Sequence, residues 1–308
     1  MKSENRNILT LFVLILGYYI YNLGTGGKIM KGIIFTCTFA PMLLLLMIIA
    51  KRMDRKENFM ILFVKALLIN DILYWVKTYT ITTWCLQMDL DRISIFMFLD
   101  YVAGVGEFFA SILSYFIDFV GVGLWEESLK LILAFCISNG FKKVKNKYDL
   151  IWYFIVSSVA FSTQETFEYC AYTSNNWIPL CVFRLIVGTA CHIGFCLITH
   201  HFVDKARKST NVLKKIKWYV VGIVLAGMAH CLRNSMTTIG PIILDVGIDV
   251  LWCIPFLIAS KIIDCAITII SWNRILEIFK QTKSYNIKYR RLYLKPSSFE
   301  VGGSYFVS

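Results

Sequence analysis

The sequence predicts an all-α, polytopic membrane protein, built as a transmembrane helix bundle of about eight or nine spans. Of its 308 residues, 57% are hydrophobic and 17% are charged, and the mean hydropathy is +0.62. A soluble globular domain carries roughly 25% charged residues, so the composition favours a membrane environment. Several apolar runs have about 20 residues, the length that a helix needs to cross a bilayer. The basic residues bunch between these runs, as expected for loops that stay in the cytosol.

The apolar runs set the order of the predicted elements. The candidate spans lie at about 8–23, 32–50, 59–80, 93–118, 119–140, 150–173, 178–203, 218–239 and 241–265. The first follows a charged start and lacks a small-residue cleavage site, so we expect an uncleaved anchor. The chain then divides into N-terminal spans of open topology (1–118), a helix bundle rich in intramembrane polar residues (119–240), and a last span with a basic cytosolic tail (241–308).

The basic loops predict which ends of the spans face the cytosol. The loops 141–149 and 204–217 and the tail from about 270 are basic, and an even number of spans separates each pair, so all three belong in the cytosol. The basic loop 51–58 is separated from 141–149 by three candidate spans, which would place it on the opposite side. The polar span 59–80 is the expected cause, as a segment that lies on the membrane surface or re-enters it.

Charge and cysteine content exclude several classes of protein. The net charge of +12 would suggest a nucleic-acid partner in a soluble chain. Here the basic residues flank apolar runs and lack interleaved aromatic residues in the first three clusters, so we expect a lipid bilayer as the partner and no nucleic acid. The ten cysteines lie mostly in apolar spans without a Cys-x-x-Cys motif, which indicates small apolar residues rather than a disulfide or zinc framework.

The most unusual stretch is Glu-Glu-Ser-Leu-Lys, from Glu126 to Lys130, inside an apolar run. An isolated acid or lysine at the centre of a bilayer costs roughly 2.5 to 3.5 kcal/mol, so three on one span must face a bundle interior. On a helix Lys130 lies within reach of both Glu126 and Glu127. The alternative is a charge cluster at a helix end that lipid headgroups solvate.

Three more predicted spans carry polar and aromatic residues at helical spacing. The groups, one for each span, are Phe161, Glu165 and Tyr169; Arg184 and His192; and His230 and Asn234. Counted from the basic loops at about 1.5 Å per residue, five side chains share a depth of roughly 16–23 Å, those of Glu126, Lys130, Glu165, His192 and His230. Singly, an intramembrane histidine is more often a hydrogen-bonded structural residue than a catalyst, and Arg184 is equally well explained as a headgroup contact. Together they predict a polar cavity within the membrane.

These motifs, in this order, resemble those of the PrsW family of intramembrane proteases, within the wider group that includes the CAAX-prenyl endopeptidases. The resemblance covers about 120–240. The CAAX branch would show Glu-Glu-x-x-x-Arg and a histidine after the phenylalanine, whereas this chain has Lys130 and Glu165 there, which favours the PrsW branch. Thr166 and Arg233 depart from the residues usual in that branch, and they bear on fine specificity.

The resemblance implies hydrolysis of a peptide bond in a membrane-protein substrate, and the residues support a mechanism. Two carboxylates in a low-dielectric cavity can share one proton, and the ionised one can take a proton from water as general base. We expect Glu126 or Glu127 to be that base, with Lys130 holding the pair. The remaining roles are oxyanion donors (His192, His230 and Asn234), orientation of a histidine or of the water (Glu165), and substrate binding (Arg184, Phe161 and Tyr169).

The sequence also predicts the partners of this site and leaves three different functions open. We expect no cofactor and no metal, a cell-membrane location, and a substrate such as a single-span regulator (an anti-sigma-like protein in a bacterium). Two glutamates and two histidines at one depth could instead ligate zinc, although the His-Glu-x-x-His spacing is absent and Lys130 would repel a cation. The same buried charges would also suit a transporter or proton relay, or a binding protein without catalytic activity.

Overall fold

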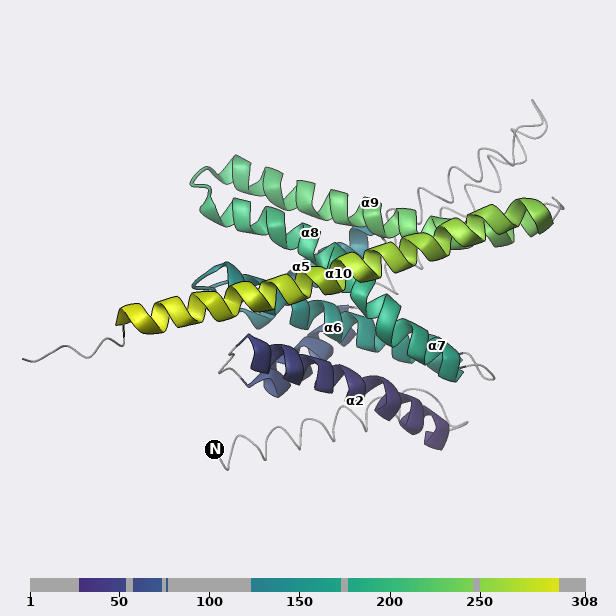
Figure 1. The fold of residues 1–308 in the computed structure, drawn as a ribbon, viewed down its shortest axis with the longest axis horizontal. Coiled ribbons are helices and arrows are strands. Elements are labelled where there is room, and N and C mark those ends of the chain that lie inside the picture. The colour runs from purple at the N-terminus through teal and green to yellow at the C-terminus, as the bar shows by residue number, and fades with distance from the viewer. Residues whose placement is uncertain are drawn as a thin grey trace, which may run out of the picture.

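The computed structural model describes residues 28–53, 58–73, 76, 123–172, 177–245 and 250–293, and within these ranges it contains helices and no strand. The elements, in order, are α2 (Lys28–Arg52), a helix over 59–73, α5 (Trp125–Ile137), α6 (Lys147–Tyr172), α7 (Trp177–Phe183), the π-helical turn η2 (Arg184–Gly188), α8 (Thr189–Lys208), α9 (Val212–Asp245) and α10 (Val250–Tyr293). The all-α prediction is therefore confirmed for the described residues (Figure 1).

Two of the described helical stretches are long and apolar enough to cross a membrane by length and composition alone. They are Met30–Arg52 and Trp177–Lys208. The predicted spans 8–23 and 93–118 lie outside the described residues. The count of eight or nine spans stays a prediction.

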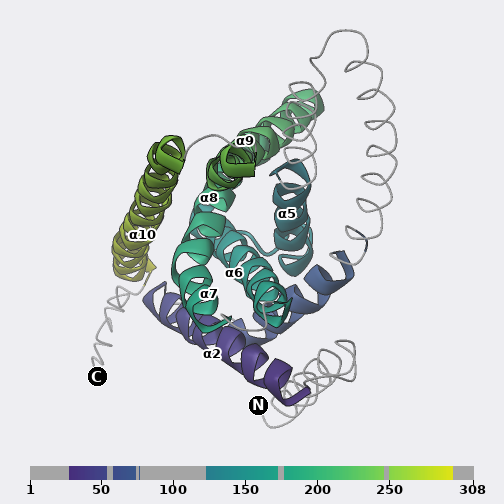
Figure 2. The same cartoon turned by 90° about the vertical axis from the view of Figure 1, so that its right-hand side faces the viewer.

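Helices α6 and α8 form the centre of the bundle. Helix α8 packs against α5, α6, α9 and α10, and α6 packs against α2 and α5 as well. Figure 2, seen along the bundle, shows α2, α5, α9 and α10 arranged around these two helices. Residues 150–164 of α6 are all buried, as expected for a helix that is surrounded on every side. The polar side chains that this part of α6 carries therefore face other helices.

Two glycines bring α5 and α9 into backbone contact. A Cβ atom added to Gly123 would lie 2.5 Å from the carbonyl oxygen of Gly227. Small residues at a helix crossing allow this close approach. Because His230 follows Gly227 by one turn, and Glu126 and Glu127 follow Gly123 by one turn, the crossing places the glutamates opposite the histidine.

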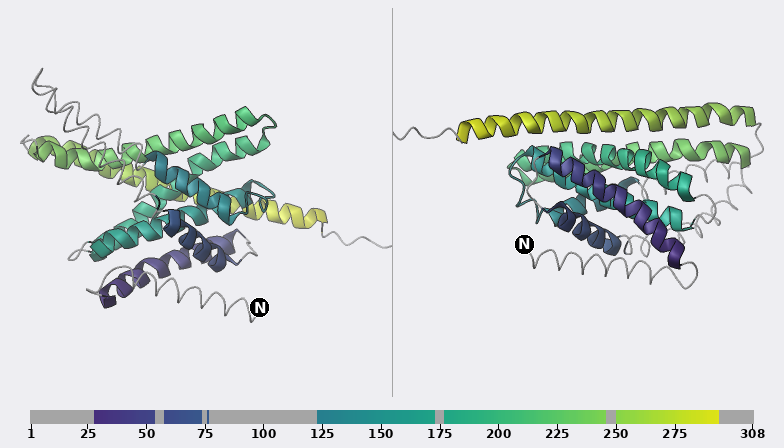
Figure 3. Two further views of the ribbon diagram at one scale, coloured as in Figure 1. Left: turned by 180° about the vertical axis from the view of Figure 1, so that it is seen from behind. Right: turned by 60° about the horizontal axis from the view of Figure 1, so that its bottom comes forward.

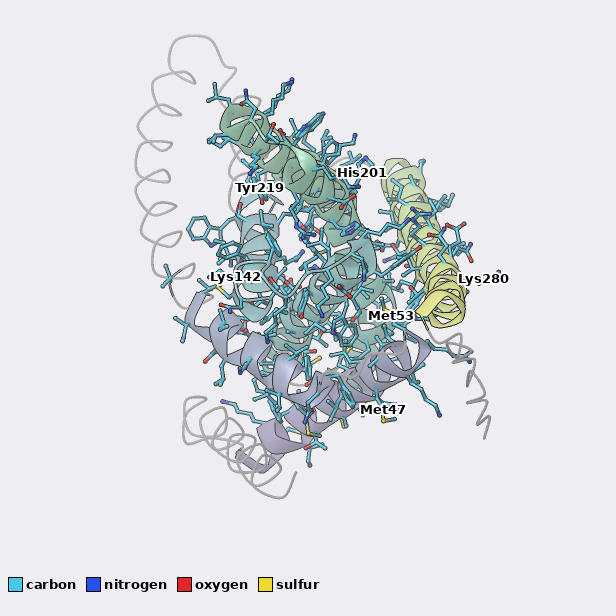
Figure 4. All side chains as sticks on the ribbon, turned by 90° about the vertical axis from the view of Figure 1, so that its left-hand side faces the viewer. Met47, Met53, Lys142, His201, Tyr219 and Lys280 are labelled. Carbon is cyan, nitrogen blue, oxygen red and sulfur yellow. The ribbon has the colours of Figure 1, made fainter. Side chains whose placement is uncertain are left out.

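The basic loops gather at one end of the bundle. The end of α2, the α5–α6 turn, the α8–α9 turn and the C-terminal end of α10 lie together at the left of Figure 1. Figure 4 looks at this end and labels Met53, Lys142, His201 and Lys280. The C-terminal end of α2 thus lies at the same end as the α5–α6 turn, whereas the count of candidate spans would place the two on opposite sides, and the topology of 1–118 stays a prediction.

The helix over 59–73 packs against the bundle through one buried face, and whether the segment 59–80 re-enters the membrane stays a prediction. Phe63 and Ala66 are fully buried in the core. Two of the polar residues that make this span look weak in the sequence, Asn70 and Asp71, form contacts with α6. The Nδ2 atom of Asn70 donates to Oε1 of Gln164 at 2.5 Å, and Nε2 of Gln164 donates to Asp71 at 3.2 Å. Hydrogen bonds between helices, rather than solvation, explain these side chains.

Helix α10 extends well beyond the predicted last span of 241–265. It begins at Val250 and continues to Tyr293, so much of the basic tail is helical. After Pro255 the helix contains no glycine or proline that would end it. In the right-hand view of Figure 3, α10 runs along the bundle and past its end. The bundle thus has a long outer helix whose inner face covers α8 and α9.

Candidate active site

Glu127 is the buried centre of the polar cluster. Its Oε1 atom accepts a hydrogen bond from Lys130 Nζ at 2.5 Å and lies 2.9 Å from Nδ1 of His230. The side chains of Glu127 and Lys130 are 0% exposed. Lys130 comes from the next turn of α5, whereas His230 comes from α9. Glu127 is thus held from two sides, and Lys130 bonds this carboxylate in particular.

The contact with Glu127 fixes the tautomer of His230. An ionised carboxylate only accepts, so Nδ1 of His230 carries the hydrogen, and in the neutral ring Nε2 is an acceptor. Nε2 faces Oε2 of Glu126 across 3.9 Å. This separation is too long for a direct hydrogen bond, but it is short enough for one water molecule, at about 2.8 Å from each atom, to bridge the two groups. The ring of Phe195 stacks on His230 with centroids 4.7 Å apart and holds its plane.

His192 connects Lys130 to a second carboxylate. Its Nδ1 atom lies 3.0 Å from Lys130 Nζ, and because an ammonium only donates, Nδ1 is the acceptor. Its Nε2 atom lies 2.7 Å from Oε2 of Glu165. The same oxygen lies 2.8 Å from Nη2 of Arg184. A continuous chain of polar contacts therefore runs from Glu127 through Lys130 and His192 to Glu165 and Arg184.

A π-helical turn positions Arg184. The wide turn η2 spans Arg184–Gly188 and leads directly into α8, which carries His192. Thr189 supports it, because its hydroxyl donates to the carbonyl of Arg184 at 3.3 Å and lies 2.9 Å from the hydroxyl of Ser162. Such turns inside α-helices often occur at functional sites. Here the extra residue in the turn brings Arg184 and His192 to the same carboxylate.

Two serines of α6 tie the backbone around the site. The hydroxyl of Ser157 donates to the carbonyl of Lys130 at 2.6 Å, and that of Ser158 donates to the carbonyl of His192 at 3.3 Å. Both are fully buried. These serines are not among the site residues predicted from the sequence. Their presence in the otherwise apolar run of α6 is the signal that could have found them.

The predicted binding residues Phe161, Tyr169 and Arg184 lie along one side of the cluster. Lys130 Nζ is 4.8 Å from the ring centroid of Phe161, and the guanidinium of Arg184 is 4.0 Å from that of Tyr169. Tyr169 is 50% exposed, in contrast to Lys130. Glu165 and Arg184 have intermediate side-chain exposures of 14% and 15%. The site thus becomes more open from α5 towards α6 and η2.

The side chain of Asn234 contacts Arg233, which lies outside the cluster around Glu127. Nη1 of Arg233 donates to Oδ1 of Asn234 at 3.2 Å. Nε of Arg233 in turn donates to Oδ1 of Asp264, on α10, at 2.8 Å. In the sequence Arg233 stands out only as a departure from the family pattern, and Asp264 is not predicted at all. An acid near the end of an apolar span is the signal that could have found it.

The donor types of the site fit a metal ion. Glu126, His192 and His230 offer three buried ligand atoms that all lie within 4.8 Å of one another. Zinc accepts histidine nitrogen and carboxylate oxygen at about 2.0–2.2 Å, so a bound ion would draw these atoms closer together. Each histidine also has its second nitrogen beside a glutamate, as zinc-binding histidines usually do. The ammonium of Lys130 is the cation that contacts Glu127 and His192.

The fold and this buried acid–histidine cluster define a class of helical protein with a charged site inside its bundle. The family model described as "PrsW family intramembrane metalloprotease" matches residues 89–260, and the chain belongs to this PrsW family. The chain is also 27% identical over 117 residues to Protease PrsW of Bacillus subtilis (strain 168). That similarity covers 38% of this chain and 52% of the relative, so the chain spans about half the length of the curated protein that it matches. No solved structure matches the chain.

Proposed function

We propose that the protein is an intramembrane endopeptidase that hydrolyses a peptide bond in a membrane-protein substrate, with water activated by Glu126. One observation carries this assignment. Oε2 of Glu126 faces Nε2 of His230 across 3.9 Å, while Glu127 is engaged by Lys130 and by the other nitrogen of the same ring. The two adjacent glutamates therefore have different roles.

Glu126 is the better general base because Glu127 has a structural task. Glu127 accepts from Lys130 and fixes the tautomer of His230, and proton uptake on its carboxylate would weaken both contacts. A water between Glu126 and His230 can give one hydrogen bond to each acceptor. Glu126 takes a proton as the water oxygen attacks the carbonyl carbon of the substrate, and it returns that proton to the leaving amine.

The tautomers also bear on which group stabilises the oxyanion. His192 accepts from Lys130 at Nδ1, and its Nε2 faces Glu165, so this ring orients the site rather than facing the substrate. His230 becomes a donor at Nε2 only once it has taken up a proton. Asn234, one turn after His230 on α9, carries an amide N–H group that suits the oxyanion. We therefore assign Asn234 as the oxyanion donor, while His230 accepts a hydrogen bond from the attacking water.

The more open side of the cluster favours substrate approach along α6 and η2. Tyr169 is half exposed, and the guanidinium of Arg184 covers its ring. The expected substrate is a single-span protein of the cell membrane whose backbone passes this side and reaches Glu126. The basic ends of α2, α5 and α8 would lie on the cytosolic side of that membrane.

A metal-assisted version of the same reaction is the second candidate, favoured by the ligand group and by the description of the matching family model. Glu126, His192 and His230 would hold the ion. A bound ion would polarise the peptide carbonyl and favour ionisation of water. Glu127 and Glu165 would still orient the two histidines, whereas Nδ1 of His192 would have to exchange its bond from Lys130 for the ion.

The test begins with comparative membrane proteomics of cells that carry the wild type or Glu126→Gln, which identifies a truncated substrate. Purified protein and that substrate are then combined in liposomes. We expect Glu126→Gln to lower kcat at least about 100-fold, the usual contribution of a general base. Glu277→Gln, which alters an exposed glutamate of α10 paired with Arg274, is the matched control and should cleave normally.

Cleavage by Glu126→Gln at the wild-type rate would reject the proposal. The metal question is decided in the same preparation by metal analysis and by treatment with 1,10-phenanthroline. Stoichiometric zinc, with activity lost on chelation and regained on adding zinc, would establish the second candidate in place of the first.

A further inference from the structure

We propose that Asp264 of α10 is a positioning residue for the active site, which acts by holding Arg233 so that Arg233 orients the amide of Asn234. This inference rests on the proposed function, because it gives Asn234 the task of donating to the oxyanion. It assigns a role to a residue that lies just beyond the range 89–260 matched by the family model.

The contacts form a relay from α10 to α9. Nε of Arg233 donates to Oδ1 of Asp264 at 2.8 Å, and Nη1 of Arg233 donates to Oδ1 of Asn234 at 3.2 Å. Asp264 is 2% exposed, and its charge is compensated chiefly by the guanidinium, since the ammonium of Lys261 lies farther away, at 3.9 Å from Oδ2. The planar guanidinium has its donors in fixed directions, so one residue can bond the carboxylate and the amide together.

The relay determines which way the amide of Asn234 points. A guanidinium carries donors only, so the atom it contacts must be the amide oxygen and not the nitrogen. The NH2 group of Asn234 therefore lies on the opposite edge of the planar amide, pointing away from Arg233. Asn234 follows His230 by four residues and shares its face of α9, whereas Arg233 is rotated by about 100° towards α10. Fixing the oxygen through Arg233 thus turns the N–H group towards the side of His230.

Helix α10 is packed closely enough to serve as a fixed support. Ser271, two turns after Asp264 on the same inner face, lies so close to α8 that a Cβ atom on Gly194 would strike its hydroxyl. Ile275 and Ile278 continue this buried face into the core. Thr268 donates its hydroxyl to the carbonyl of Asp264 at 2.6 Å. The carboxylate is therefore held relative to α8, which carries His192.

The decisive variant is Asp264→Asn, which keeps the shape and an acceptor oxygen and removes the charge. The assay uses the substrate identified by proteomics, with enzyme and substrate together in liposomes. We expect kcat of Asp264→Asn to fall about 10- to 100-fold while KM stays within about twofold. This loss of kcat is somewhat smaller than the loss expected when an oxyanion donor itself is removed. Asn234→Ala should lower kcat about 100-fold or more. The double variant should resemble Asn234→Ala alone, because both changes remove the same interaction.

The variant Arg233→Lys, which is expected to fold, tests the role of Arg233 in orienting the amide of Asn234. A lysine keeps the ion pair with Asp264 but cannot bond the carboxylate and the amide at once, so kcat should fall while thermal unfolding changes little. Glu277→Gln again serves as the control on α10, since its partner Arg274 is 58% exposed. Size-exclusion chromatography and thermal unfolding in detergent verify that each variant is folded.

A wild-type kcat for both Asp264→Asn and Arg233→Lys would overturn the inference. So would losses of kcat that multiply in the double variant with Asn234→Ala, because an indirect effect on folding would be independent of the amide. Failure of the underlying function looks different: in that case Glu126→Gln would also cleave normally. The two failures are therefore distinguished within one set of proteins.

Discussion

Replacement of Lys130 by methionine should turn the site into a divalent-cation site. Lys130 is fully buried, and its ammonium lies 2.5 Å from Glu127 and 3.0 Å from His192. Counted as ionised, the cluster has the acids Glu126, Glu127 and Glu165 against Lys130 and Arg184, an excess of one negative charge. Without Lys130 the excess becomes two, which a zinc ion balances. Methionine has a similar length and no charge.

The size of the effect follows from the buried ion pair. Removing one partner of such a pair costs about 3–5 kcal/mol, because the other charge stays buried without compensation. Lys130→Met should therefore unfold at a clearly lower temperature than the wild type in detergent without metal. Zinc at about 100 times its dissociation constant restores roughly 2.7 kcal/mol, so most of the loss should be recovered on adding zinc.

Thermal unfolding with and without zinc, together with metal analysis of the dialysed protein, measures both effects independently of cleavage. Lys261→Met is the matched control, because the side chain of Lys261 is 64% exposed and its ammonium lies 3.9 Å from the carboxylate of Asp264. It should change neither stability nor metal content appreciably. Wild-type protein that already holds stoichiometric zinc, with Lys130→Met holding it no more tightly, would refute the view that the ammonium acts as the resident cation.

Two further predictions test the helix crossing and the orientation. Gly227→Ala places a Cβ atom 2.9 Å from the backbone of the facing helix and should cost about 1–3 kcal/mol of stability as well as activity, whereas Gly188→Ala meets only an ordinary 3.6 Å contact and should be nearly neutral in thermal unfolding. Single cysteines at Lys51, Lys145 and Lys208, in a protein without its native cysteines, should all react with an impermeant thiol reagent from the same side of the membrane. Labelling of Lys51 from the opposite side would contradict the arrangement of α2.

Helix positions are predictable from the sequence wherever a long apolar run stands between charged loops. The apolar run predicts a helix over 150–173, and α6 spans Lys147–Tyr172. The π-turn η2 is not predictable in this way, because one extra residue in a turn leaves the apolar pattern unchanged. The same holds for the contacts of Asn70 and Asp71 with α6. In the sequence alone, a polar residue lowers the apolar character of a predicted span. Its hydrogen-bond partner can be identified only when the neighbouring helix is known.

The residues of the site are predictable as a set, while their pairing is not. Common depth on four helices indicates that the acids and histidines meet, and the structure brings them together. Spacing alone allows Lys130 to reach either glutamate, since both i,i+3 and i,i+4 partners lie on its side of the helix. The choice of Glu127 depends on His230, which approaches the same oxygen from α9. Tertiary packing therefore determines which glutamate Lys130 contacts, and the spacing of the residues in the sequence cannot predict it.

The division between buried and more open charges explains how one cluster can be both stable and reactive. The pair of Glu127 and Lys130 is 0% exposed and holds its geometry because either charge alone would be strongly destabilising there. Glu165 and Arg184 are more exposed and form the side from which substrate and water can arrive. The proposed base, Glu126, lies between these two environments. Its side chain is 5% exposed, and its Oε2 atom faces His230, which the fixed pair holds in place.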